Sequence, residues 1–147
     1  MEYGGVNHFA QKSKMAAYQS VSVHGGIAGA DPHGLVLMLM DGALDCMHIA
    51  RGCMERGDVG RKAKLLHSCI SLIAELRGCL DMARGAAIAQ NLSALYEYMM
   101  RQLLRANAEN NAAFIAEVQS LLTEIRGAWV AIGPEVRQMG RAAPASA

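Results

Sequence analysis

The chain contains four stretches in which apolar residues recur every three or four positions, separated by short segments rich in glycine, proline or asparagine. This spacing is typical of an α-helix with one apolar side, because about 3.6 residues make one helical turn. Helices of this kind are stable mainly when their apolar sides pack together. Since short connections make consecutive helices antiparallel neighbours, the pattern predicts an all-α protein, an antiparallel up-and-down four-helix bundle.

The first helix is predicted to begin at Asp31 and Pro32, because aspartate is favoured at the N-cap and proline at the first helical position. Polar residues then keep to a single stripe: Asp41, Asp45, His48 and Glu55. The first half of this helix is therefore apolar nearly all round. Such a helix either lies in the middle of a bundle or offers a second apolar face to another chain.

The other three helices are predicted from their apolar residues, which span 65–83, 88–106 and 114–132. A break at Gly85 separates the second helix from the third. Gly133 and Pro134 are predicted to close the fourth helix, because both residue types commonly follow a helix end.

The length of 147 residues fits one domain. The bundle is predicted over residues 31–133. Residues 1–30 hold enough apolar side chains for a short helix or a mobile strap laid along the bundle, and residues 134–147 are predicted to be a disordered tail.

Composition excludes several classes of partner. The formal net charge is only +1, which argues against nucleic acid, because nucleic-acid-binding domains are usually strongly basic. The longest apolar run stops at Asp41 and is shorter than the roughly 20 residues of a membrane span, so no membrane insertion is predicted. The N-terminus lacks the apolar region of a secretory signal, which predicts a cytosolic protein. The four cysteines lack metal-ligand spacing and are predicted to be free thiols.

Signs of an enzyme are few. Asp45 and His48 are three residues apart on one helix, as in half of a di-metal site, but such a site needs a second copy of this motif and further glutamates. A solvated face is the favoured interpretation, and a metal-dependent enzyme is the less favoured alternative. Phosphate-binding and nucleophile-elbow motifs are also missing. The sequence therefore predicts no catalysis, no metal and no cofactor.

Five segments, taken in order, resemble the family of flagellar export chaperones called FliS. The resemblance extends from about Met15 to Ile132. Its segments are AYQSVSV (17–23), ADPHGLVLMLMDGAL (30–44), GDVGRKAKLL (57–66), IAQNLSALYEYMMRQLLRAN (88–107) and EVQSLLTEIRGAW (117–129). Some positions depart from the family pattern: Met40 replaces an aromatic residue, and Gly85-Ala86 replaces a pair of glycines.

The resemblance implies a cytosolic helical bundle that binds the disordered C-terminal segment of flagellin. Such chaperones prevent premature polymerisation of flagellin and help to deliver it to the flagellar type III export gate, whose components are further possible partners. The free chain is then expected to be a monomer. The alternative is a self-associating structural or adaptor bundle that uses the same apolar face.

The resemblance also implies which residues contact the partner. In the N-terminal strap they are Met15, Tyr18 and Val21, and in the first helix Leu39, Met40 and Ala43. In the third helix they are Asn91, Leu95, Tyr98 and Met99. Each has a simpler interpretation, since Leu95 can be core and an asparagine such as Asn91 often stabilises local backbone. The two tyrosines suit an interface, because each has a large ring with a polar tip.

Overall fold

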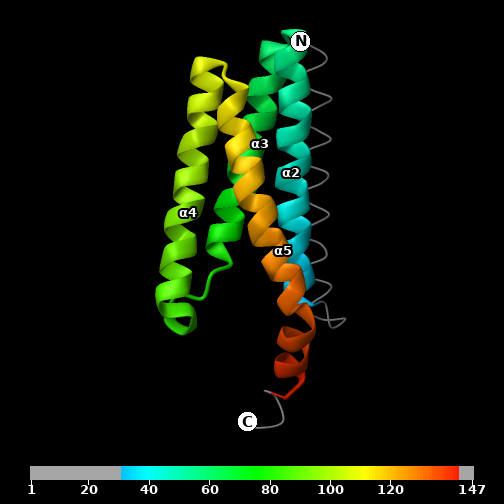
Figure 1. Cartoon of the computed structure of the whole chain (residues 1–147), viewed down its shortest axis with the longest axis vertical. Coiled ribbons are helices and arrows are strands. Elements are labelled where there is room, and N and C mark those ends of the chain that lie inside the picture. The colour runs from blue at the N-terminus through cyan, green and yellow to red at the C-terminus, as the bar shows by residue number, and fades with distance from the viewer. Residues whose placement is uncertain (1–30, 143–147) are drawn as a thin grey trace.

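The computed structural model describes residues 31–142, with side chains through residue 134, and every element in this range is an α-helix (Figure 1). The helices are α2 (Pro32–Arg56), α3 (Val59–Gly78), α4 (Met82–Glu109) and α5 (Ala112–Ala142). The predicted all-α class is confirmed for this range. The predicted strap, with Met15, Tyr18 and Val21, lies outside the described residues.

The helices form a bundle in which each one contacts two others. Helix α2 packs against α3 and α5, and α4 packs against the same two helices. In Figure 1 the four helices lie alongside one another, and the chain turns back at each connection. Within residues 31–142, no helix is both long enough and apolar enough to cross a membrane.

Aspartate side chains start three of the helices. The carboxylates of Asp31, Asp58 and Asp81 accept hydrogen bonds from the backbone N–H groups of residues 33, 61 and 84. These bonds satisfy N–H groups that have no partner within the first helical turn. The predicted start at Asp31 and Pro32 is confirmed.

All four helices contribute to one hydrophobic core. Its largest fully buried side chains include Met40, Met47, Leu66, Ile73, Met99, Leu103, Ile115 and Leu122. Each such side chain stabilises the fold by about 1.5–3 kcal/mol relative to exposure to water. The cysteines are free thiols, as predicted; Cys46, Cys53 and Cys69 are buried and Cys79 is exposed.

A buried lysine joins α3 to the end of α4. Lys62 is only 3% exposed, and its Nζ donates to the backbone oxygen of Asn107 at 3.2 Å and to Oδ1 of Asn110 at 3.0 Å. Asn110 ends α4 in a left-handed conformation with φ 51°. The ammonium group therefore satisfies oxygens at the C-terminus of α4, where positive charge is favourable.

The boundary between the second and third predicted helices was wrong. Helix α3 ends at Gly78, so the predicted apolar face does not continue through Leu80 to Ala83 on one helix. Asp81 instead caps α4, which begins before the expected break at Gly85. The break is present as a kink inside α4, where Ala86 has φ 46° and ψ −122°.

The predicted end of the last helix was also wrong. Helix α5 continues through Gly133 and Pro134 to Ala142. A Cβ atom at Gly133 would lie 2.9 Å from Cε1 of His33, so this glycine allows α5 to approach α2 closely. Gly133, which suggested the end of a helix, is therefore explained by its close approach to His33, a residue distant in the sequence.

Candidate protein-binding surface

The first turn and a half of α2 keeps apolar side chains partly exposed on every side. Leu35, Val36, Leu37 and Met38 are all half-buried. Successive residues of a helix point about 100° apart, so these four side chains together cover its whole circumference. The start of α2 is therefore apolar on all sides, as predicted, and its apolar side chains are partly exposed.

The three site residues predicted further along α2 lie in the core. Leu39 is 6% exposed, Met40 1% and Ala43 0%, and all three belong to the main hydrophobic cluster. They pack inside the bundle in this structure. Their contact with a partner stays a prediction.

One side of α4 carries most of the remaining predicted residues. Ile88, Asn91, Leu95 and Tyr98 share this side by helical spacing, and we call them the α4 face. Ile88 is 73% exposed, Asn91 is exposed, and Leu95 and Tyr98 are half-buried. Met99, in contrast, is fully buried in the core. The structure therefore brings three of the four predicted α4 residues together on the surface.

Two features of this face favour contact with another chain. Ile88 is the most exposed of the large apolar side chains in the described part of the protein, and the sequence prediction missed it. Ile88 lies three residues before Asn91 in the same sequence motif, and this spacing could have indicated that the two residues share one side of the helix. The Asn91 side chain forms no hydrogen bond with any other described residue. Its amide can therefore pair with polar groups of a partner.

Polar contacts fix the other end of the α4 face. The Tyr98 hydroxyl donates to Oε1 of Glu117 in α5 at 2.8 Å, and Nε2 of Gln102 donates to the same oxygen at 2.9 Å. We call Tyr98, Gln102 and Glu117 the Glu117 cluster. These hydrogen bonds lower the pKa of Glu117, and the bond to Glu117 raises the pKa of Tyr98. The carboxylate thus stays ionised and the phenol stays protonated at neutral pH.

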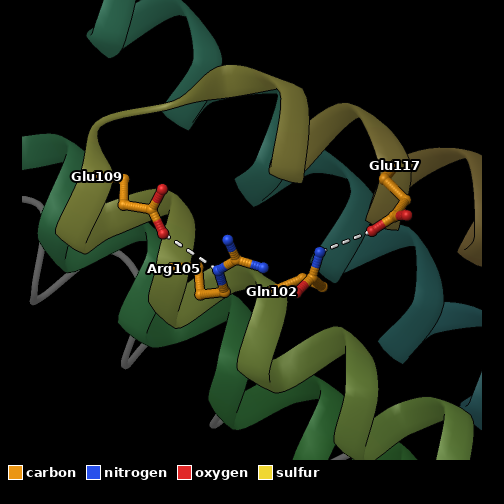
Figure 2. Close-up of polar contacts among 4 residues, drawn as sticks. All are labelled: Gln102, Arg105, Glu109 and Glu117. Atoms are coloured by element: carbon orange, nitrogen blue, oxygen red, sulfur yellow. Dashed lines mark hydrogen bonds and ion pairs between the residues drawn. The ribbon is translucent and has the colours of Figure 1, made fainter.

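Arg105 lies beside this cluster but has other partners. Its Nε is 3.1 Å from Oε2 of Glu109, and its guanidinium lies 4.3 Å from the centre of the Phe114 ring. Figure 2 shows Arg105 directed to Glu109 and Gln102 directed to Glu117. The Glu117 carboxylate is therefore held by two neutral donors.

A second set of contacts joins the start of α2 to α5. The His33 and Trp129 rings stack with centroids 4.7 Å apart and an interplanar angle of 11°. Nε1 of Trp129 donates to the backbone oxygen of His33 at 2.9 Å, and Nε2 of His33 donates to the backbone oxygen of Trp129 at 2.5 Å. Nearby, Arg126 pairs with Asp41 at 2.5 Å, which raises the pKa of Arg126. The sequence prediction assigned no role to His33.

The possible metal motif of α2 lies on the surface. Asp45 and His48 are both exposed. Among the residues that the structure describes, no group of three or more histidine, cysteine, aspartate or glutamate side chains could hold a metal ion.

Known proteins similar to this chain share one description. A sequence model of the family described as flagellar protein FliS matches residues 14–136. The flagellar secretion chaperone FliS of Salmonella typhimurium is 44% identical over 124 residues, which are 84% of this chain and 92% of that protein. The flagellar secretion chaperone FliSB of Pseudomonas aeruginosa is 40% identical over 121 residues, 82% of this chain and 95% of that protein. The Bacillus subtilis FliS is 34% identical over 120 residues, 82% of this chain and 86% of that protein.

Proposed function

The chain belongs to the FliS family of flagellar proteins, and from this membership we propose that it is a flagellar secretion chaperone that binds the C-terminal segment of flagellin. It acts in the cytosol without catalysis, keeps flagellin from polymerising early and aids its delivery to the type III export gate. The chaperone role is supported by the descriptions of the relatives. The choice of flagellin as client is supported by the resemblance of the five sequence segments.

We also propose that the chain is a single domain, whose helices form an antiparallel up-and-down four-helix bundle. The contacts of α2 and α4 with α3 and α5 support this arrangement, because they put the four helices in a ring of neighbours. Residues 1–30 act as the strap, and the predicted tail of residues 134–147 is reduced to the residues after Ala142, where α5 ends.

The observation that carries the proposal is the exposed apolar side chain of Ile88 beside the unbonded amide of Asn91. An amphipathic partner helix packs apolar anchors against such a surface, while an amide can bind its backbone. We propose that the flagellin segment contacts the α4 face. The proposed contact set is Ile88 together with the residues that the resemblance implies: Met15, Tyr18, Val21, Leu39, Met40, Ala43, Asn91, Leu95, Tyr98 and Met99.

The client is expected to fold as it binds. A disordered segment loses conformational entropy when it is ordered, and burial of apolar surface offsets this cost. Burial of apolar surface also gives a negative heat-capacity change. Binding of the client and its heat-capacity change can both be measured by calorimetry.

Calorimetry with a peptide of the flagellin C-terminal segment tests the proposal. We expect a one-to-one complex with a negative heat-capacity change. Ile88→Asp should weaken binding at least about tenfold, since it places a charge in an apolar contact. Leu104→Asp is the matched control, because Leu104 is 58% exposed on the same helix but lies about 160° around it from Ile88. Absence of binding at tens of micromolar peptide would contradict the proposal.

A self-associating bundle is the second candidate, because an exposed apolar side chain such as Ile88 suits a second copy of the chain as well as a client. Light scattering distinguishes the two. A mass that stays at one chain as the protein concentration rises supports the chaperone, and a concentration-dependent dimer supports self-association.

A further inference from the structure

We propose that Glu117 is a positioning residue for client binding: its carboxylate holds the Tyr98 side chain at the edge of the α4 face, in the orientation that contacts the client. This inference rests on the proposed function. It assigns a role to a residue of α5 that does not itself belong to the proposed contact set.

Two hydrogen bonds hold the Glu117 carboxylate in place. Gln102 is only 7% exposed, and its amide donates to the same Glu117 oxygen that accepts the Tyr98 hydroxyl. Tyr98 and Gln102 are four residues apart, so both donors project from the same side of α4. A buried amide thereby fixes the carboxylate, and the carboxylate fixes the phenol.

The charged groups around the Glu117 cluster keep the Tyr98 hydroxyl protonated, so that it can donate a hydrogen bond. From α5, Glu117 raises the pKa of Tyr98, and from α4, Arg101 and Arg105 lower it by a smaller amount. The result is a raised pKa, so the hydroxyl is protonated at physiological pH. The ionised Glu117 can then accept its hydrogen bond throughout the neutral range.

The Glu117 cluster lies at a boundary on α4, between the part of the helix that runs close to α5 and the part where Ile88 and Asn91 are exposed. In Figure 1, α5 runs close to the C-terminal half of α4 and then leans away toward α2. Tyr98 contacts α5 through Glu117, whereas Ile88 and Asn91, further toward the N-terminus of α4, are exposed. A ring held at this boundary is half-buried and available to a client. Because its orientation is set before binding, the complex loses less side-chain entropy.

A double-mutant cycle in the full chain tests the inference, with affinity for the flagellin peptide measured by calorimetry. Glu117→Ala and Tyr98→Phe should each weaken binding by up to about tenfold, because a Tyr98 ring that is not held in place loses more side-chain entropy when it binds the client. The double variant should bind no more weakly than either single variant, because both substitutions remove the same contact. Glu117→Gln retains an oxygen acceptor and should restore most of the affinity.

Controls separate positioning from folding. Glu124→Ala changes an exposed carboxylate of the same helix and should leave affinity unchanged. Circular dichroism should show that Glu117→Ala keeps its helical content. In an NMR titration that resolves the Tyr98 ring from the other three tyrosines, the pKa of Tyr98 should fall toward the ordinary value of about 10 in Glu117→Ala.

The outcomes are distinct. If the wild-type chain binds the peptide and Glu117→Ala binds equally well, or if the two losses simply add, the positioning role is overturned while the proposed function stands. If the wild-type chain does not bind, the proposed function is overturned and the positioning role with it.

Discussion

Burial of the Tyr96 side chain shifts the pH range in which its hydroxyl ionises. Its side chain is 2% exposed, and burial, with a smaller effect of Cys79, raises its pKa from 10 to about 12. A phenol whose pKa is raised in the folded state contributes stability that is complete below pH 10. That contribution is lost as the pH rises from 10 toward 12.

The alkaline pH dependence of unfolding is therefore predicted to include a Tyr96 contribution. Urea unfolding at about pH 9 and pH 12 should show a loss of stability in the wild-type chain that is smaller in Tyr96→Phe, by about 2–3 kcal/mol for a shift of two pKa units. Equal losses in the two proteins would show that Tyr96 ionises as readily in the folded chain as in the unfolded one.

Candidate site residues were predicted to different degrees. Asn91, Leu95 and Tyr98 could be named because a sequence motif carries them, and the structure puts them on one side of α4. Glu117 could not, because its role depends on hydrogen bonds from α4 to α5 that no local pattern records. A motif identifies residues along one helix, whereas contacts between helices require the packed fold.

The kink in α4 places an alanine in a backbone conformation that glycine adopts more easily. Ala86 has φ 46° and ψ −122°, a conformation in which a Cβ atom is strained and glycine is not. Ala86→Gly should therefore raise the free energy of unfolding by up to about 1 kcal/mol, measured by chemical denaturation. The control is Ala87→Gly, which should lower it by about 0.5–1 kcal/mol because residue 87 is helical. Destabilisation by both substitutions would show that Ala86 is helical in solution.

The contact between α2 and α5 leaves little room for a side chain at Gly133. A Cβ atom at Gly133 would lie 2.9 Å from His33, so Gly133→Ala should displace the imidazole from Trp129. We expect a loss of about 1–3 kcal/mol, typical of overpacking, and a change in tryptophan fluorescence. Trp129 is the single tryptophan of the chain, so the tryptophan emission reports the surroundings of this residue alone.

Gly127→Ala is the matched control for this contact. Nothing lies within 4 Å of a Cβ atom at Gly127, so the substitution should stabilise α5 by up to about 1 kcal/mol through helix propensity and leave the emission unchanged. A Gly133→Ala protein with wild-type stability and emission would mean that the two helices are less closely packed than described.

Helix boundaries were predictable where local chemistry sets them. Asp31 and Pro32 start α2 as expected, because N-cap and first-turn preferences act within a few residues. The start of α4 at Asp81 was missed because apolar spacing continues through Leu80 and Ala83, which suggested one helix. The continuation of α5 past Gly133 was missed because that glycine makes room for His33, a residue of α2.

The apolar composition of the chain has two explanations. Hydrophobic residues make up 52% of the chain and charged residues 18%. The core of the bundle holds many of the apolar side chains. Others stay exposed in the described part of the chain: Val59, Met82, Ile88, Leu104, Val130 and Ile132. An exposed apolar surface is what a client or a second copy of the chain would cover.

The thermal stability of the whole chain distinguishes these two occupants. A ligand that binds only the folded state stabilises it by about 2.7 kcal/mol when its free concentration is 100 times its Kd. We therefore expect the Tm of the free chain to be independent of protein concentration and to rise when the flagellin peptide is added. Differential scanning calorimetry at two protein concentrations, with and without peptide, measures both effects. The rise with peptide should be smaller in Ile88→Asp and unchanged in Leu104→Asp, because only the first substitution alters the α4 face. A Tm that rises with protein concentration but not with peptide would instead show that the bundle covers its apolar surface by self-association.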